Sequence, residues 1–211
     1  MTVRVVTAPA YEPVTRAQAK LWAKLDADLT ADDAIIDLLV KTMREYAENL
    51  TGRAFVQRTL QYIMPATELL KVGDSTRTGF KLPFPPLISV SSITYIDTDG
   101  VQQTLAAADY DVHTWVEPGI VVEDWNASWP SYRGEPDAWR INYLAGYAPG
   151  SPPDEAAHQE VLPAALKVWV QARIATLYNI REQVLAGNFS DIPRDYADGR
   201  LDALIIGERL F

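Results

Sequence analysis

The period of hydrophobic and polar positions changes twice along the 211-residue chain. Apolar residues recur at helical spacing up to Gly52, alternate over residues 54–147, and return to helical spacing after residues 149–153. A spacing of three or four residues indicates an amphipathic helix, whereas alternation indicates a strand with one buried face. The pattern therefore predicts an α+β fold: a small helical bundle of three main helices plus a C-terminal helix, with a central antiparallel β lobe inserted.

This change of period also predicts the division of the chain into segments. We expect residues 1–53 to form an N-terminal arm and the helix pair of the bundle, and residues 54–147 to form the β-rich lobe. Residues 148–211 should contain a linker, the third bundle helix and a C-terminal segment. The Pro/Gly-rich residues 149–153 are typical of a linker, and residues 1–13 should be extended, either against a neighbour or loose.

Capping residues mark the first two helices. Thr15 and Gln18 form a capping-box pattern at the start of a helix that should reach about residue 25. Thr30 is the expected N-cap of a second helix, and Gly52 is a suitable residue to end it. Because only a few residues separate the two helices, they should pack as an antiparallel pair.

Pro163 suits the first turn of a third helix, which should extend to about residue 181. A loop at 182–193 and a short last helix at about 194–206 should follow. The side chains predicted for the bundle core are Trp22, Leu39, Met43, Trp169 and Leu177.

Alternating residues and turn signals define the β lobe. Asp99-Gly100 is a strong turn signal between two alternating runs, and it predicts a hairpin over residues 88–105. A polar loop is expected at 71–79. The other predicted strands cover residues 54–64, 110–113, 119–122 and 139–145.

Composition excludes several classes of function. The formal net charge of −9 repels phosphate at long range, which argues against a sequence-reading DNA-binding protein. The absence of cysteine excludes disulfides and thiolate chemistry. No apolar run approaches the roughly 20 residues of a membrane helix, and we expect neither a membrane segment nor a signal peptide.

Candidate catalytic and metal-binding residues are few. The two histidines, His113 and His158, have no second ligand at helical spacing, and no nucleotide-binding or catalytic-triad motif is present. Asp97 and Asp99 resemble the start of a calcium loop, but the remaining ligands are missing, so a hairpin turn is favoured. We therefore expect a protein that is not an enzyme and has no metal or cofactor.

The β lobe also contains an aromatic cluster: Trp115, Trp125, Trp129, Tyr132 and Trp139. Such residues can stack on sugars, but they also pack well in cores and interfaces. Glu123 and Asp124 suggest a glycosidase pair, yet adjacent residues of a strand point to opposite faces. A carbohydrate-binding module that uses this lobe remains an alternative function.

Several stretches together resemble one protein family. They are PVTRAQAKLWAKLD, DDAIIDLLVKTMREYAENLTGRAF, LPFPPLISVSSITYIDTDG, WRINYLAGY, VLPAALKVWVQARIATLYNIRE and LDALIIGERLF, which span nearly the whole chain in this order. The chain resembles the head–tail connector proteins (adaptor or head-completion proteins) of long-tailed bacteriophages and gene-transfer agents. Residues 111–137 and the ending IIGERLF depart from the family's pattern.

The resemblance implies a structural virion protein without catalysis. Members of the family form a ring, usually of twelve identical subunits, beneath the portal protein. The ring extends the DNA channel, through which DNA passes without sequence-specific binding, and joins the capsid to the next neck or tail-completion protein. The chain would be made in the host bacterial cytoplasm and reside in the virion neck. Another neck or tail-completion protein of the same particle is an alternative.

The C-terminal segment is the portal-binding arm that the resemblance implies. Its apolar residues are too numerous for a free tail, so they should dock on the portal or fold back on their own bundle. The residues predicted for portal binding are Leu201, Leu204, Ile205, Arg209, Leu210 and Phe211.

Overall fold

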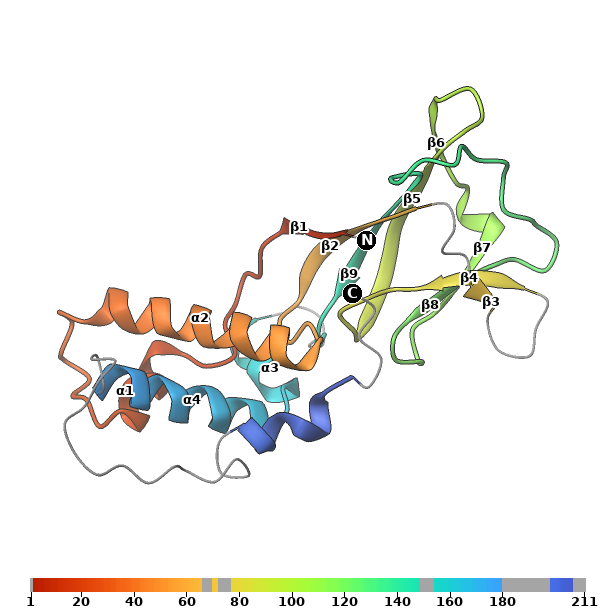
Figure 1. The fold of residues 1–211 in the computed structure, drawn as a ribbon. Helices are drawn as coiled ribbons and strands as arrows, with labels where there is room; N and C mark the ends of the chain where they lie inside the picture. Colours follow the sequence, from red (N-terminus) through yellow and green to blue (C-terminus); the bar gives the residue numbers. More distant parts are fainter. Residues whose placement is uncertain (1, 66–69, 72–76, 149–153, 180–197, 207–211) are drawn as a thin grey trace, which may run out of the picture. The chain divides into compact units, whose positions relative to one another are not determined.

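The computed structural model describes residues 2–65, 70–71, 77–148, 154–179 and 198–206 (Figure 1). They divide into two compact units. The β unit contains the described residues up to Ala10 and those from Gln57 to Tyr147, and the helical unit contains Tyr11–Val56 and the described residues after Tyr147. The predicted α+β class, with antiparallel β structure inserted between helical segments, is confirmed.

Two antiparallel sheets form the β unit. The five-stranded sheet has the order β1 (Thr2–Thr7), β2 (Arg58–Met64), β9 (Trp139–Ala145), β5 (Leu87–Ile96) and β6 (Gln102–Thr104). The four-stranded sheet has the order β3 (Leu70–Lys71), β4 (Thr78–Lys81), β8 (Ile120–Glu123) and β7 (Tyr110–His113). A short 3-10 helix, η2 (Ala107–Asp109), precedes β7.

Strands β2 and β9 follow the expected alternation. Every second side chain in each strand is buried, beginning with the first. Their register pairs Leu60 with Tyr143 and Met64 with Trp139, so large apolar groups meet on one face. Burial raises the pKa of the Tyr143 hydroxyl, which donates a hydrogen bond of 2.7 Å to the Pro83 carbonyl oxygen. This face forms part of the core of the β unit.

The predicted hairpin is confirmed as β5 and β6. The Asp97 carboxylate accepts hydrogen bonds from the backbone N–H groups of Asp99 (3.0 Å) and Val101 (2.8 Å), which closes the turn. Gly100 has a φ of 83°, a conformation that favours glycine. The simple two-face alternation expected for β5 does not hold, because its register with β9 shifts twice.

Three expectations for the β lobe need correction. The first residues are extended, as expected, but as β1 they pair with β2 at the edge of the five-stranded sheet, so they are neither loose nor part of the helical unit. Residues 54–56 are fully buried in the helical unit instead of beginning β2. The polar loop at 71–79 is interrupted, because Leu70 and Lys71 pair with Gly79 and Thr78 in β3 and β4.

The helical unit contains α1 (Arg16–Trp22), α2 (Asp33–Thr51), α3 (Glu155–Val161), α4 (Ala164–Asn179) and the 3-10 helix η4 (Asp198–Leu204). The capping box is present, since Thr15 accepts from the Gln18 N–H at 3.1 Å and donates its own N–H to the Gln18 side chain at 2.9 Å. Gly52 ends α2 with a φ of 72°. Among the described helices, none has the length and apolar character needed to cross a bilayer.

The helix limits differ from expectation in four places. Trp22, not residue 25, ends α1, and the N-cap of α2 is Asp32, not Thr30. Helix α3 was not expected; its N-cap Asp154 accepts a hydrogen bond of 2.7 Å from the Ala157 N–H. The described part of the last helix, Asp198–Leu204, is a 3-10 helix and not an α-helix. The expected loop at 182–193 and the linker at 149–153 lie outside the described residues.

The predicted core residues fall into different environments. Met43 and Trp169 are buried, and Leu39 is half-buried. Trp22 is 45% exposed and Leu177 is 41% exposed, so their assignment to the core is wrong. Both are apolar residues on helices that have more than one apolar face, and each lies on a face directed away from the core.

A buried ion cluster joins the start of the helical unit to α2. Arg44 donates hydrogen bonds of 2.8 Å to Glu12 and to Glu48. Glu48 also accepts a hydrogen bond of 3.0 Å from the Phe55 backbone N–H. Burial raises the pKa of Glu12 despite its contact with Arg44. The cluster therefore ties together residues that precede, form and follow α2.

Candidate interaction surface

The described part of the C-terminal segment folds against its own helical unit. Leu201 on η4 is fully buried. The Ile206 N–H donates a hydrogen bond of 3.0 Å to the Thr51 carbonyl oxygen, and Arg53 Nε donates one of 2.6 Å to the Leu204 carbonyl oxygen. One backbone hydrogen bond and one from the Arg53 side chain thus hold this segment at the end of α2.

These contacts divide the predicted portal-binding residues. Leu201 cannot present its side chain to a partner, which corrects its place in the predicted set. Leu204 and Ile205 are half-buried and retain some accessible surface. Arg209, Leu210 and Phe211 lie outside the described residues.

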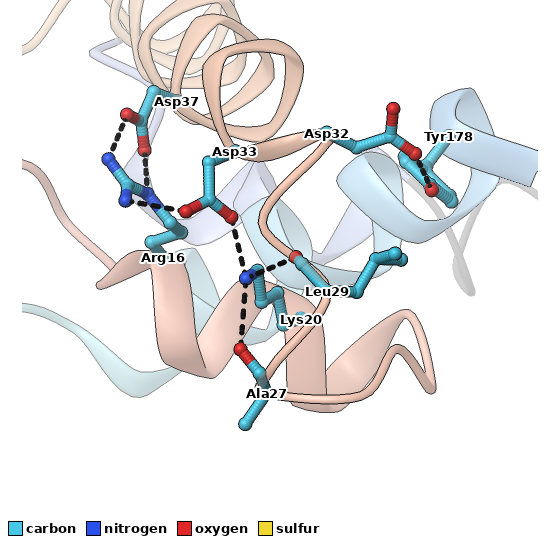
Figure 2. A network of polar contacts seen from close by, with 8 residues as sticks. All are labelled: Arg16, Lys20, Ala27, Leu29, Asp32, Asp33, Asp37 and Tyr178. Atoms are coloured by element: carbon cyan, nitrogen blue, oxygen red, sulfur yellow. Dashed lines mark hydrogen bonds and ion pairs between the residues drawn. The ribbon is translucent and has the colours of Figure 1, made fainter.

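Figure 2 shows a polar network that fixes the connection between α1 and α2. Lys20 Nζ donates hydrogen bonds to the carbonyl oxygens of Ala27 (3.2 Å) and Leu29 (2.7 Å), and lies 2.6 Å from Asp33 Oδ1. The Lys20 side chain is buried, so these three acceptors replace its water. Lys20 therefore holds the loop and the first turn of α2 together.

Arg16 and Tyr178 extend the network to both sides. Arg16 donates hydrogen bonds to Asp37 (2.8 Å from Nε) and to Asp33 (2.9 Å), and the Tyr178 hydroxyl donates one to Asp32 (Figure 2). The Lys20 ammonium, with Arg16 as a further cation, lowers the pKa of the Asp33 carboxyl below its ordinary value. In the opposite direction, the hydrogen bond to Asp37 raises the pKa of the Arg16 guanidinium. The loop is thus held between α1, α2 and α4.

An open cavity of about 650 Å³ lies beside this network. Its cations already have protein partners, since Lys20 and Arg16 bind Asp33 and Asp37. The remaining lining is mostly small or apolar, with Leu21 and Leu25 among it. This arrangement suits contact with an apolar side chain better than binding of a small charged ligand.

Two stripes of apolar side chains are exposed on the helical unit. The α1 stripe consists of Leu21, Trp22 and the neighbouring loop residue Leu29; Leu21 is 80% exposed. The α2 stripe consists of Ile35, Leu38 and Tyr46; Leu38 is 64% exposed. Soluble proteins seldom leave such groups uncovered without a reason, so both stripes are candidate interaction surfaces.

The sequence pattern did not predict an exposed apolar stripe on α1 or α2, and it assigned Trp22 to the core. A signal for the α2 stripe was present, because the apolar residues of α2 occupy two faces. Ile36, Val40, Met43 and Ala47 recur at core spacing. In the α2 stripe, Ile35 and Tyr46 flank that buried face, and Leu38 points away from it. Tyr46 still has one intramolecular contact, stacking on Trp169 with ring centres 5.8 Å apart.

The aromatic cluster of the β unit separates into a packed group and two exposed rings. Trp139 is fully buried, and the rings of Trp129, Tyr132 and Phe80 lie 5.2–6.3 Å from one another or from Trp139. The packed group belongs to the core of the unit, so its aromatic rings do not form an exposed row for a sugar.

Trp115 and Trp125 are 76% and 75% exposed. They follow opposite ends of the β7–β8 pair, in which His113 faces Ile120 and Tyr110 faces Glu123. The Arg77 guanidinium lies 5.2 Å from the centre of the Trp125 ring, a cation–π contact. The two rings therefore have separate surroundings, unlike a paired sugar-stacking platform.

The acidic candidates have structural partners. Glu123 Oε1 accepts a hydrogen bond of 3.0 Å from the Thr78 N–H, and Asp124 Oδ1 accepts one of 2.9 Å from the Asn126 N–H. Asp97 closes the hairpin, and its hydrogen bonds, chiefly that from Gln103, lower the pKa of its carboxyl. Within the described part of the chain, no three His, Asp or Glu residues are grouped as metal ligands.

Comparison with known proteins identifies relatives in structure only. No protein-family profile and no curated protein sequence matches the chain. Among solved structures, a chain from the virion of a native gene transfer agent (GTA) particle matches with a TM-score of 0.72 at 20% identity. Chains from the neck of an empty GTA particle, computed with C6 symmetry, and of a native one, computed with C12 symmetry, match with TM-scores of 0.72 and 0.64 at 21% and 20% identity.

Each of these matches covers 100% of this chain and 98% of the other. The likeness therefore includes both the helical and the β unit and is not confined to one common motif. The chain has the fold of chains found in the virion and neck of gene transfer agent particles.

Proposed function

We propose that this chain is a structural head–tail adaptor of a phage-like or gene-transfer particle. It forms a ring under the portal, extends the DNA channel and joins the capsid to the next neck or tail-completion protein. The observation that carries this proposal is the full-length structural likeness to chains of GTA necks and virions, with a TM-score of 0.72. The resemblance of its sequence to adaptor proteins supports the finer assignment.

The chemistry of the chain agrees with a passive channel component. A net charge of −9 repels a DNA backbone, so DNA sliding through a lumen of such subunits would not adhere. The most prominent acidic candidates act as turn and strand partners, as described above for Asp97, Glu123 and Asp124. Several of the exposed apolar groups, among them Leu21 and Leu38, lie on outer helix faces, where protein partners can cover them.

We further propose that residues 207–211 form the arm that docks on the portal. The segment before it is anchored to Thr51 and Arg53, which leaves Arg209, Leu210 and Phe211 as the candidate contact residues. Leu204 and Ile205 would form the edge of that contact. Arg209 can add a charge-assisted hydrogen bond to a portal carboxylate.

Cryo-EM of the particle neck tests the proposed role. The gene would be deleted in cells that produce the particle and replaced by a copy with an N-terminal tag. We expect the tagged chain in a ring directly beneath the portal, and heads without tails when the gene is absent. A ring at another level would favour the alternative of a different neck or tail-completion protein. Tailed particles that lack the chain altogether would overturn the proposal.

Mass measurement of the purified chain, with and without portal, tests assembly. We expect monomers or a mixture of small oligomers alone and rings with portal, because partner binding supplies the free energy that orders the subunits. A stable dimer under both conditions would contradict a portal-templated ring.

A further inference from the structure

We infer that the α1 stripe of one copy and the α2 stripe of the next form a head-to-tail contact between copies of this chain. The α1 stripe is Leu21, Trp22 and Leu29, and the α2 stripe is Ile35, Leu38 and Tyr46. This inference rests on the ring proposed above and names the surfaces that would close it.

The two stripes lie on outward faces of the helical unit. Each stripe lies outside the face that its helix buries, which includes Ala19 and Lys20 in α1 and Ile36 and Val40 in α2. Because both helices bury those faces in one shared core, the stripes face outward on different sides of the helical unit. Figure 1 draws α2 along one side of this unit and α1 and α4 along the other.

Two different surfaces on different sides are what a ring requires. A twofold dimer pairs one surface with itself, whereas a cyclic ring joins one surface of each copy to a different surface of the next. A single exposed stripe would fit a dimer. The two stripes are of similar chemistry, and within the described residues each keeps apolar side chains at least 40% exposed, which fits a head-to-tail arrangement.

The net charge of the chain is compatible with a second copy as the partner that covers the two stripes. Copies with a net charge of −9 repel one another, so their contact should use surface without strong charge. All six side chains of the two stripes are uncharged. The α2 stripe is bordered by charges of both signs, Lys41 and Glu45, which avoids a like-charge border on that side.

The α1 stripe is also held in place before any contact forms. Lys20 fixes the Leu29 carbonyl at 2.7 Å, and Lys20 and Arg16 tie α1 to the first turns of α2. A surface that is already ordered loses little conformational entropy on association. The open cavity lined by Leu21 and Leu25 gives an incoming apolar side chain, such as Leu38, a place to enter.

The absence of cysteine makes a direct test possible. Leu21→Cys and Leu38→Cys would be made in separate full-length chains, and both positions are exposed enough for the fold to tolerate the change. Particles would be produced with either chain alone or with an equal mixture, then treated with a short thiol cross-linker. Non-reducing gels would report the products, and thermal melting would check the fold.

We expect cross-linked dimers in particles made with the mixture and none with either variant alone. A chain that carries both substitutions should give a ladder of products. The matched control combines Leu21→Cys with Ala203→Cys, an exposed position on η4 outside both stripes, and should give no product.

Dimers from Leu21→Cys alone or Leu38→Cys alone would show a self-paired surface and overturn the inference. A neck ring seen by cryo-EM in the same particles, with no cross-link in the mixture, would overturn the inference and leave the proposed function intact. Absence of the chain from the neck would overturn both.

Discussion

Arg44 donates a hydrogen bond of 2.8 Å to Glu48, one turn further along α2, and both side chains are almost completely buried. Replacing Arg44 by alanine would leave Glu12 and Glu48 close together without the cation. We expect Arg44→Ala to lower the free energy of unfolding by about 3–5 kcal/mol, the usual cost of breaking a buried pair. Chemical denaturation would measure it.

Lys41→Ala is the matched control, since Lys41 is an exposed cation on the same helix. It should change the free energy of unfolding by no more than about 0.5 kcal/mol. Equal losses of unfolding free energy in Arg44→Ala and Lys41→Ala would show that the buried ion cluster stabilises the fold no more than an exposed charge does.

Two tryptophans of the helical unit should respond differently to truncation. Trp169 is fully buried, so Trp169→Ala should cost about 3–5 kcal/mol. Trp22→Ala removes a half-exposed ring and should cost clearly less, while reducing incorporation into particles through loss of the α1 stripe. Denaturation curves and particle composition measure the two effects. If Trp169→Ala left the free energy of unfolding almost unchanged, the burial of Trp169 in the core would be contradicted.

Asp33 should contribute to acid sensitivity. Lys20 and Arg16 lower the pKa of Asp33 in the folded state, so its stabilising effect is fully present above its ordinary pKa of 3.8. That effect is lost as the pH falls below this value through the lowered pKa. Asp33→Asn should therefore reduce the melting temperature at pH 7 and make the decline toward pH 2 shallower. Asp28→Asn, an exposed change in the same loop, should leave the dependence of the melting temperature on pH as in the wild type.

Gly79 has no room for a side chain. A Cβ at this position would lie 2.2 Å from the Val121 carbonyl oxygen, on the neighbouring strand β8. We expect Gly79→Ala to destabilise the β unit by about 1–3 kcal/mol, measured by thermal or chemical unfolding. Gly134→Ala is the control, because no atom lies within 4 Å of its Cβ position, and it should be nearly neutral.

Deletion of residues 207–211 separates docking from folding. The hydrogen bond from Ile206 to Thr51 remains, so the melting temperature should change little, while incorporation into particles should be lost. By comparison, Leu201→Ala empties a buried site and should cost about 2–5 kcal/mol. If the truncated chain loses cooperative melting, the deleted residues belong to the core and the arm assignment fails.

The elements that could be predicted from sequence are those with a strong period or a defined turn. Asp97 and Gly100 marked the β5–β6 hairpin, and Gly52 marked the end of α2. Strand β1 carries no such signal, because five of its six side chains are exposed and its pairing uses backbone groups. Helix α3 was missed because its segment is polar and short.

Side-chain burial was harder to predict than helix position. Apolar spacing identified α1 and α2, but it does not say which of two apolar faces meets the core. Trp22 was therefore assigned to the inside, although its side chain is 45% exposed. The core contact of Trp169 was easier to predict, since the buried face of α4 continues through Leu166, Val170 and Ile174.

The inserted β segment leaves and rejoins the helical segments at paired residues. Arg58, near the start of β2, lies opposite Ala145, at the end of β9. The segment of almost ninety residues between them therefore begins and ends at neighbouring positions, as a tight turn does. Lengthening or replacing the segment between these two residues changes the loop-closure entropy only slowly. Changes in the length of the inserted segment therefore need not alter the helices of the other unit.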